Sequence, residues 1–149
     1  MKAVLPSALL ALALAGFAHA ADPVKVEAAW ARPIVAGQDS TGAYMTLTAS
    51  EPLTLLGAET PAAGIVEIHE MKMVGDVMKM RAAETLALAA GKPLVLKPGG
   101  YHLMLMDLKA PFKAGTRIQV TLRLRDAKGA EQKVNVTVPV AASAAAAKH

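Results

Sequence analysis

The sequence predicts an all-β protein, a sandwich or barrel of short strands. Many short segments are rich in Val, Leu, Thr and Ile, and several alternate apolar and polar residues as half-buried strands do. Gly and Pro separate these segments at the short intervals typical of antiparallel folds. No long segment has the 3.6-residue apolar period that an amphipathic helix requires.

Five strands are expected in the first half of the chain. They cover residues 24–30, 42–48, 53–56, 65–73 and 77–81. The first alternates apolar and polar side chains, and the second has the Tyr, Thr and Leu content that favours strands. Pro52 and Pro61 bound the third. Between the last two, Gly75-Asp76 fits the centre of a two-residue hairpin.

Four more strands are expected after residue 90. They cover residues 93–96, 101–108, 117–125 and 133–138. Between the first two, Lys97-Pro98-Gly99-Gly100 has Pro and Gly where a type II turn needs them. The last two strands alternate and are joined by a turn at 126–129. The alanine-rich stretch 81–90 resembles a helix, but Gly91 and Pro93 favour a strand or loop crossing.

The N-terminus has the features of a secretory signal peptide. Lys2 precedes an apolar run at 3–17, and Ala18-His19-Ala20 fits the small-x-small cleavage rule. The run is too short for a membrane span, and no later stretch is long or apolar enough to be one. We expect a signal peptide at 1–20, one exported domain at 21–140 and a disordered alanine-rich tail at 141–149.

Composition excludes several classes of function. The chain has no cysteine, which rules out thiol nucleophiles, zinc knuckles and thiolate-ligated blue copper. The net charge is +4, but the basic residues are scattered, so we expect a solvated surface and no nucleic-acid partner. Neither paired carboxylates nor a Ser/His/Asp pattern stands out, so we do not expect an enzyme.

Histidine and methionine concentrate between residues 65 and 108, which hold six of the eight methionines. The spacing is His69, ten residues, Met80, twenty-one residues, His102, one residue, Met104. Soft thioethers select Cu(I), and imidazole binds copper readily. In an oxidising compartment, methionine supplies soft sulfur without forming disulfides. We therefore expect these four side chains to bind Cu(I).

Strand geometry brings these residues together. A two-residue turn at Gly75-Asp76 predicts the opposing pairs Val74–Val77, Met73–Met78, Met71–Met80 and His69–Ala82. Met80 is then a diagonal neighbour of His69 on one face, roughly 7–8 Å away at the backbone. His102 and Met104 share a face because side chains two apart point the same way. The interval between Met80 and His102 allows a crossover that brings the two pairs alongside.

Each feature also has an ordinary explanation. A lone strand histidine is more often structural than a ligand. Methionine is a common core filler, so packing is the default role of four of the remaining methionines, Met45, Met73, Met78 and Met106. We keep Met71 and Met106 as auxiliary metal ligands because they share faces with His69 and Met104, and we assign no role to His19 or His149.

At these residues the sequence resembles the PCuAC-type periplasmic copper chaperones, whose signature is matched without a gap by His69, Met80, His102 and Met104. Residues 29–32, 42–45 and 97–102 also look like the family, and the resemblance covers 24–140. It implies a cupredoxin-like barrel with a surface Cu(I) site, so the predicted fold is an all-β, cupredoxin-like Greek-key β-sandwich or barrel. Some relatives carry a His/Met-rich C-terminal extension, which this alanine-rich tail lacks.

The resemblance also implies a role in the periplasm. The expected partner is a copper-accepting protein, such as the CuA-bearing subunit of cytochrome c oxidase or another copper chaperone. Copper buffering for metal tolerance through the same site is the alternative function. An exported β-sandwich whose Met-rich face docks a partner is a third. Because both histidines must be deprotonated to bind, copper affinity should fall in acid.

Overall fold

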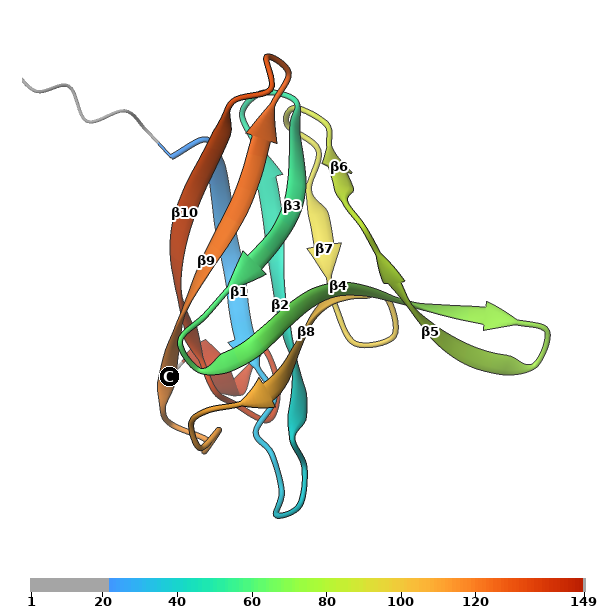
Figure 1. Cartoon of the computed structure of the whole chain (residues 1–149), viewed down its shortest axis with the longest axis vertical. Helices are drawn as coiled ribbons and strands as arrows, with labels where there is room; N and C mark the ends of the chain where they lie inside the picture. Colours follow the sequence, from blue (N-terminus) through green and yellow to red (C-terminus); the bar gives the residue numbers. More distant parts are fainter. Residues whose placement is uncertain (1–21, 149) are drawn as a thin grey trace, which may run out of the picture.

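The computed structural model describes residues 22–148, which form ten strands in two sheets (Figure 1). The strands are β1 (Val24–Ala31), β2 (Ser40–Ala49), β3 (Leu53–Glu59), β4 (Ala63–Val74), β5 (Val77–Ala83), β6 (Leu86–Leu88), β7 (Leu94–Leu96), β8 (Tyr101–Leu108), β9 (Arg117–Asp126) and β10 (Glu131–Pro139). One sheet has the order β1-β2-β8-β4-β5, with β7 also paired to β2; the other is β10-β9-β3-β6. Every pairing between these strands is antiparallel, which confirms the all-β prediction.

The core lies between the two sheets and is aliphatic. Strand alternation points Leu103 and Leu105 of β8 inward, both fully buried, while their neighbours on β8 face the other side of the sheet. Ile68 of β4 and Leu122 of β9 join the same cluster. Met45 is also buried there, so its expected packing role is confirmed.

Strand β3 runs further than the sequence predicts because its pairing tolerates an irregularity. β3 continues to Glu59 across a register shift between Leu55 and Gly57, where the glycine has φ 149°. Such a bulge lets the strand continue past residue 56, where the sequence predicts that it ends. The stretch 81–90 contains the short strand β6, which pairs with β3, so the expected strand or loop crossing is confirmed.

β2 pairs with two strands and thereby sets the position of β8. Residues Met45–Leu47 pair with β7, and Ser40–Ala43 pair with β8. The turn between β7 and β8 has Gly99 at φ 81° and a hydrogen bond from Gly100 N to Lys97 O of 3.0 Å, as the predicted type II turn requires. β8 therefore lies between β2 and β4.

The β4–β5 hairpin projects away from the sandwich (Figure 1). Its register pairs Val74 with Val77, Met71 with Met80 and His69 with Ala82, which confirms the predicted hairpin. Gly75 has φ 63°, a left-handed value that glycine adopts without strain at the first central position of a tight hairpin turn. Only the root of the hairpin is paired on both sides, because β8 ends its pairing with β4 at Glu70.

Part of the segment 141–149, expected to be a disordered tail, has structure here. Ala141 N donates to Ala31 O at 2.9 Å, and Ala146–Lys148 forms one turn of 3-10 helix. The Ser143 hydroxyl accepts from Ala146 N at 3.2 Å and begins that turn. The signal peptide expected at 1–20 lies outside the described residues, and the division into leader, domain and tail stays a prediction. Within residues 22–148, no helix is long and apolar enough to cross a membrane.

Candidate metal site

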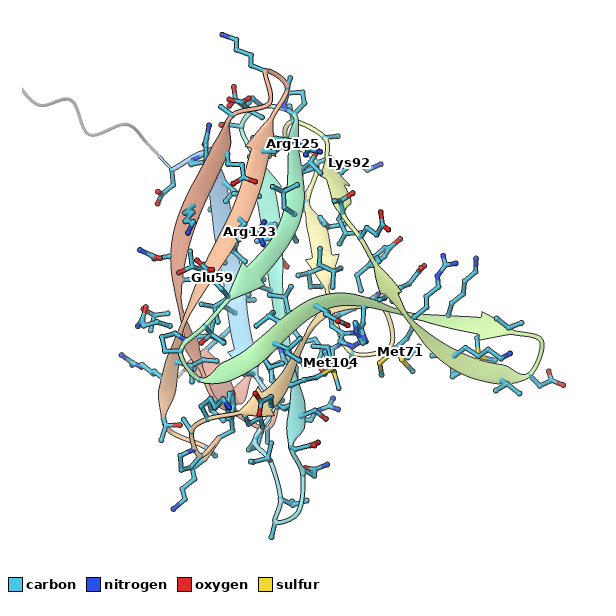
Figure 2. The ribbon with its side chains drawn as sticks, viewed as in Figure 1. Glu59, Met71, Lys92, Met104, Arg123 and Arg125 are labelled. Carbon is cyan, nitrogen blue, oxygen red and sulfur yellow. The ribbon has the colours of Figure 1, made fainter. Side chains whose placement is uncertain are left out.

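The predicted ligands lie on the outer face of the larger sheet, where β5, β4 and β8 run side by side. His69 of β4 stands directly opposite His102 of β8, and Met71 stands opposite Met80 of β5. Met104, two residues beyond His102, lies on the same face. Figure 2 shows Met71 and Met104 at the root of the β4–β5 hairpin. The fold thus brings all four predicted ligands to one region from three strands.

His102 is buried at 4% exposure and is held by the turn that precedes β8. Its Nδ1 lies 3.1 Å from Gly100 O, and a carbonyl only accepts, so Nδ1 carries the proton. The lone pair of a neutral ring is then on Nε2, where it can bind a metal. Gly100 O also accepts from Met71 N at 3.1 Å, which ties the turn to β4.

The surroundings of His102 favour its neutral, metal-binding form. Burial lowers the pKa of His102 below its ordinary value; the hydrogen bond to Gly100 opposes this, and the neighbouring His69 and Arg32 lower the pKa further. Protons therefore compete less with a metal for His102 than for an exposed histidine.

His69 is oriented by a carboxylate. Its Nε2 donates to Glu67 Oε2 at 2.8 Å, which leaves the lone pair of the neutral ring on Nδ1. That Nδ1 is buried and has no hydrogen-bond partner. A buried unpaired ring nitrogen is costly unless something else binds it, and a metal ion is one such partner. A carboxylate on the far side of a histidine ligand is the usual arrangement in metal sites.

The two imidazoles are spaced as two ligands of one ion would be. Their ring centroids are 5.9 Å apart with an interplanar angle of 58°. With metal–nitrogen bonds of about 2 Å, each centroid lies roughly 3 Å from the ion, so a shared ion requires centroids up to roughly 6 Å apart. The observed separation fits within this limit.

The thioethers border a depression of ≈ 300 Å³ beside His102. Met71, Met80 and Met104 line one side of it, and residues of β2, of the segment 32–38 before it and of the 97–100 turn line the rest. His69 does not line the depression, although its ring lies next to that of His102. Met106, kept as an auxiliary ligand, does not line it either, because it sits opposite Ile65, beyond Met104. Of these two methionines, only Met71 borders the depression.

An aromatic wall closes the site on the β2 side. The Tyr44 ring lies 6.1 Å from the His102 ring and 4.6 Å from Trp30, and Arg32 sits 5.6 Å above Tyr44. A bulge in β1, with Ala28 at φ 53°, sets the register that brings Trp30 opposite Tyr44. Gly42 leaves room for the tyrosine, because a Cβ there would lie 2.8 Å from Tyr44 Cζ.

Sequence reasoning missed Glu67 and the function of this wall. Glu67 could have been recognised from its position two residues before His69, because residues two apart on a strand lie on the same face. The wall depends on pairing between distant strands, which no local pattern reveals. Among residues 22–148, no group of three or more His, Asp, Glu or Cys side chains could hold a metal ion.

Comparison with known proteins connects this geometry to a family. A family model described as "Putative lipoprotein LpqE-like" matches residues 24–140. The chain belongs to the LpqE-like family. This LpqE-like chain is 37% identical over 107 residues to "Putative lipoprotein Lxx21020" of Leifsonia xyli, a match that covers 71% of the chain and 64% of that relative. The chain is also 35% identical to "Uncharacterized protein RP573" of Rickettsia prowazekii, and this match covers 62% of that relative. The chain therefore spans less than two thirds of the length of both curated relatives.

Solved structures similar to this LpqE-like protein include PCuAC domains. The copper-bound PCuAC domain from PmoF2 has a TM-score of 0.64 at 23% identity, covering 83% of this chain and 97% of that one. Apo-DR1885 from Deinococcus radiodurans is 33% identical with a TM-score of 0.60, covering 95% and 93%. The same protein was also solved as CuI-DR1885. These likenesses confirm the resemblance to the PCuAC-type family and the cupredoxin-like fold.

Proposed function

We propose that this LpqE-like protein is an exported Cu(I) carrier whose cargo binds to His69, Met80, His102 and Met104. One observation supports this most strongly. Each imidazole donates one N–H to an acceptor, Glu67 or Gly100, and so leaves the lone pair of its other nitrogen available to a metal. Thioethers border the depression beside His102, and this ligand set suits Cu(I) better than zinc, calcium or magnesium. The structure solved as CuI-DR1885, 32% identical, supports the same cargo.

The site is built for release as well as binding. All four ligands are neutral when bound, so no thiolate adds the strong bond that would slow transfer. Met80 is 47% exposed, whereas His102 is buried. A partner's ligand can therefore replace Met80 first, while the buried imidazole still holds the ion. The order of exchange is exposed thioether first and buried imidazole last.

We propose the CuA centre of cytochrome c oxidase as the destination, and the periplasm as the compartment. The apolar N-terminal run, the lack of cysteine and the lipoprotein descriptions of the family and of one relative support export. Delivery predicts that Cu(I) moves from this protein to an apo CuA domain, whereas storage predicts that it stays.

Anaerobic Cu(I) titration against a competing chromophoric chelator tests the site. We expect the wild-type domain to bind Cu(I) with thioether sulfur in the X-ray absorption spectrum, and Met104→Leu or His69→Ala to weaken binding. Met45→Leu is the matched control, because it removes a buried sulfur from the core at similar volume. Unchanged affinity in both ligand variants would disprove the site.

Incubation of the loaded protein with an apo CuA domain tests delivery. After separation of the two proteins, we expect copper to be found on the acceptor. The acceptor must be one that binds copper more tightly than the carrier does. If the copper still stays on the carrier, the result favours buffering over delivery.

A further inference from the structure

Two methionines of the projecting hairpin are exposed, although methionine is ordinarily a core filler. Met73 of β4 and Met78 of β5 are 55% and 45% exposed. The sequence prediction that they pack in the core is wrong. They lie on the outer face, where β4 has no partner other than β5, so no side chains of a further strand cover them. Their place in the fold therefore gives them no packing role within residues 22–148.

The hairpin register gathers four methionines on one face. Met73 opposes Met78, and one step nearer the sandwich Met71 opposes Met80. Opposed residues on an antiparallel pair have Cβ atoms roughly 4.5–5.5 Å apart, and the next pair on the face lies roughly 6.7 Å along the strands. Four flexible thioethers therefore stand in two rows that lead from the tip of the hairpin to the His69–His102 pair.

The other face of the hairpin carries different chemistry. Lys72, Lys79 and the ion pair between Arg81 Nη2 and Glu70 Oε2 (2.8 Å) lie there, together with Val74 and Val77 at the tip. The methionine face thus has neutral, soft donors, while the charges are on the reverse. A surface that serves only for apolar docking would gain nothing from sulfur, and the valines already supply apolar area. This separation of thioethers from charged groups indicates that the methionine face binds a ligand through sulfur.

We propose that Met73 and Met78, together with Met71, form a second, outer site for a soft monovalent cation, Cu(I) or Ag(I). Thioethers select such ions, and the long side chains can converge on one ion without moving the backbone. The inner site of His69, Met80, His102 and Met104 begins one row further in. An ion at the tip can then pass between the rows by exchanging one thioether at a time. The statement that the outer site carries copper in the cell rests on the proposed function, whereas the existence of the outer site does not.

Titration with Ag(I), a redox-inert stand-in for Cu(I), tests the proposal on the mature domain with carbon-13-labelled methionine methyl groups. We expect two bound equivalents by native mass spectrometry, with the Met73 and Met78 methyl signals shifting with the outer one. Met73→Leu/Met78→Leu keeps the apolar surface, removes the sulfur and should bind one equivalent. Val74→Ala/Val77→Ala, at the same tip on the other face, should still bind two.

A variant of the inner site separates the two proposals. His69→Ala/Met104→Leu should keep one equivalent, bound at the hairpin tip. The outer site is disproved if Met73→Leu/Met78→Leu binds as much Ag(I) as the wild type, or if the valine variant loses the second equivalent equally. Neither result touches the inner site. If His69→Ala/Met104→Leu instead binds as the wild type does, the proposed function fails and the outer site stands.

Discussion

At the scale of single residues, Glu67 determines which nitrogen His69 offers. Glu67→Ala removes the acceptor of the Nε2 proton, so the ring is free to turn or to change tautomer. We expect Cu(I) affinity to fall roughly 10–100-fold, the usual effect of losing such a partner. Glu67→Gln should stay near wild type, because the amide oxygen can accept the same bond.

Nitrogen-15 spectra of the His69 ring check this directly. They should show Nδ1 unprotonated in the wild type and in Glu67→Gln, and a mixed tautomer in Glu67→Ala. Glu70→Ala is the matched control, since that carboxylate pairs with Arg81 on the opposite face of β4. An unchanged tautomer and affinity in Glu67→Ala would remove Glu67 from the site.

The pKa of His102, lowered chiefly by burial, predicts two pH dependences. Because its protonation begins below the ordinary value of about 6.5, His102 should not weaken Cu(I) binding above that pH, and affinity should decline below it. The unfolded chain takes up this proton at higher pH than the folded one. The free energy of unfolding of the metal-free protein should therefore decrease as pH falls from about 6.5 through the lowered pKa.

Competition titrations between neutral pH and about pH 5, with denaturant unfolding in parallel, measure both trends. Met104→Leu should bind more weakly, yet with the same slope against pH, because a thioether does not titrate. A flat affinity across this range contradicts ligation by the two imidazoles.

At the scale of strands, the close approach of Gly42 to Tyr44 lets β2 serve as the wall of the site. In Gly42→Ala the new Cβ meets the Tyr44 ring and forces it toward His102 or outward. Overpacking of this kind typically costs about 1–3 kcal/mol. We expect a lower melting temperature and weaker Cu(I) binding, with partial recovery in Gly42→Ala/Tyr44→Phe, which removes the hydroxyl. Recovery of neither property would mean that the ring is not the cause.

The β4–β5 hairpin and the type II turn were predictable because each depends on adjacent residues. Gly75-Asp76 sets the register that aligns Met71 with Met80, and Pro98-Gly99 sets the turn whose carbonyl orients His102. The direct opposition of His69 and His102 was not predictable, since it depends on β8 entering between β2 and β4. Exposure of Met73 and Met78 was missed because local sequence does not reveal that β8 stops pairing with β4 at Glu70, before the hairpin tip.

At the scale of the whole molecule, strand patterns predicted the fold class but not the order of strands. Apolar and polar residues alternate clearly in the sequences of β9 and β10, and these two strands pair along nearly their full length. The splitting of β2 between β7 and β8, and the bulge near Ala28, involve residues far apart in the sequence. Those two features position the aromatic wall. The spacing of His and Met in the sequence therefore indicated the candidate ligands, but it did not indicate the side chains that surround them.

The candidate site joins β4, β5 and β8, so metal binding should stabilise the whole domain. A ligand that binds only the folded state adds about 4 kcal/mol at a concentration 1,000 times its Kd, which for a domain of this size raises the melting temperature by roughly 10 °C. Thermal unfolding under anaerobic conditions, with and without excess Cu(I), measures this shift. His69→Ala/Met104→Leu should show a much smaller rise, because the inner site keeps only two of its four ligands, Met80 and His102. An equal rise in that variant would place the stabilising ion somewhere other than between these three strands.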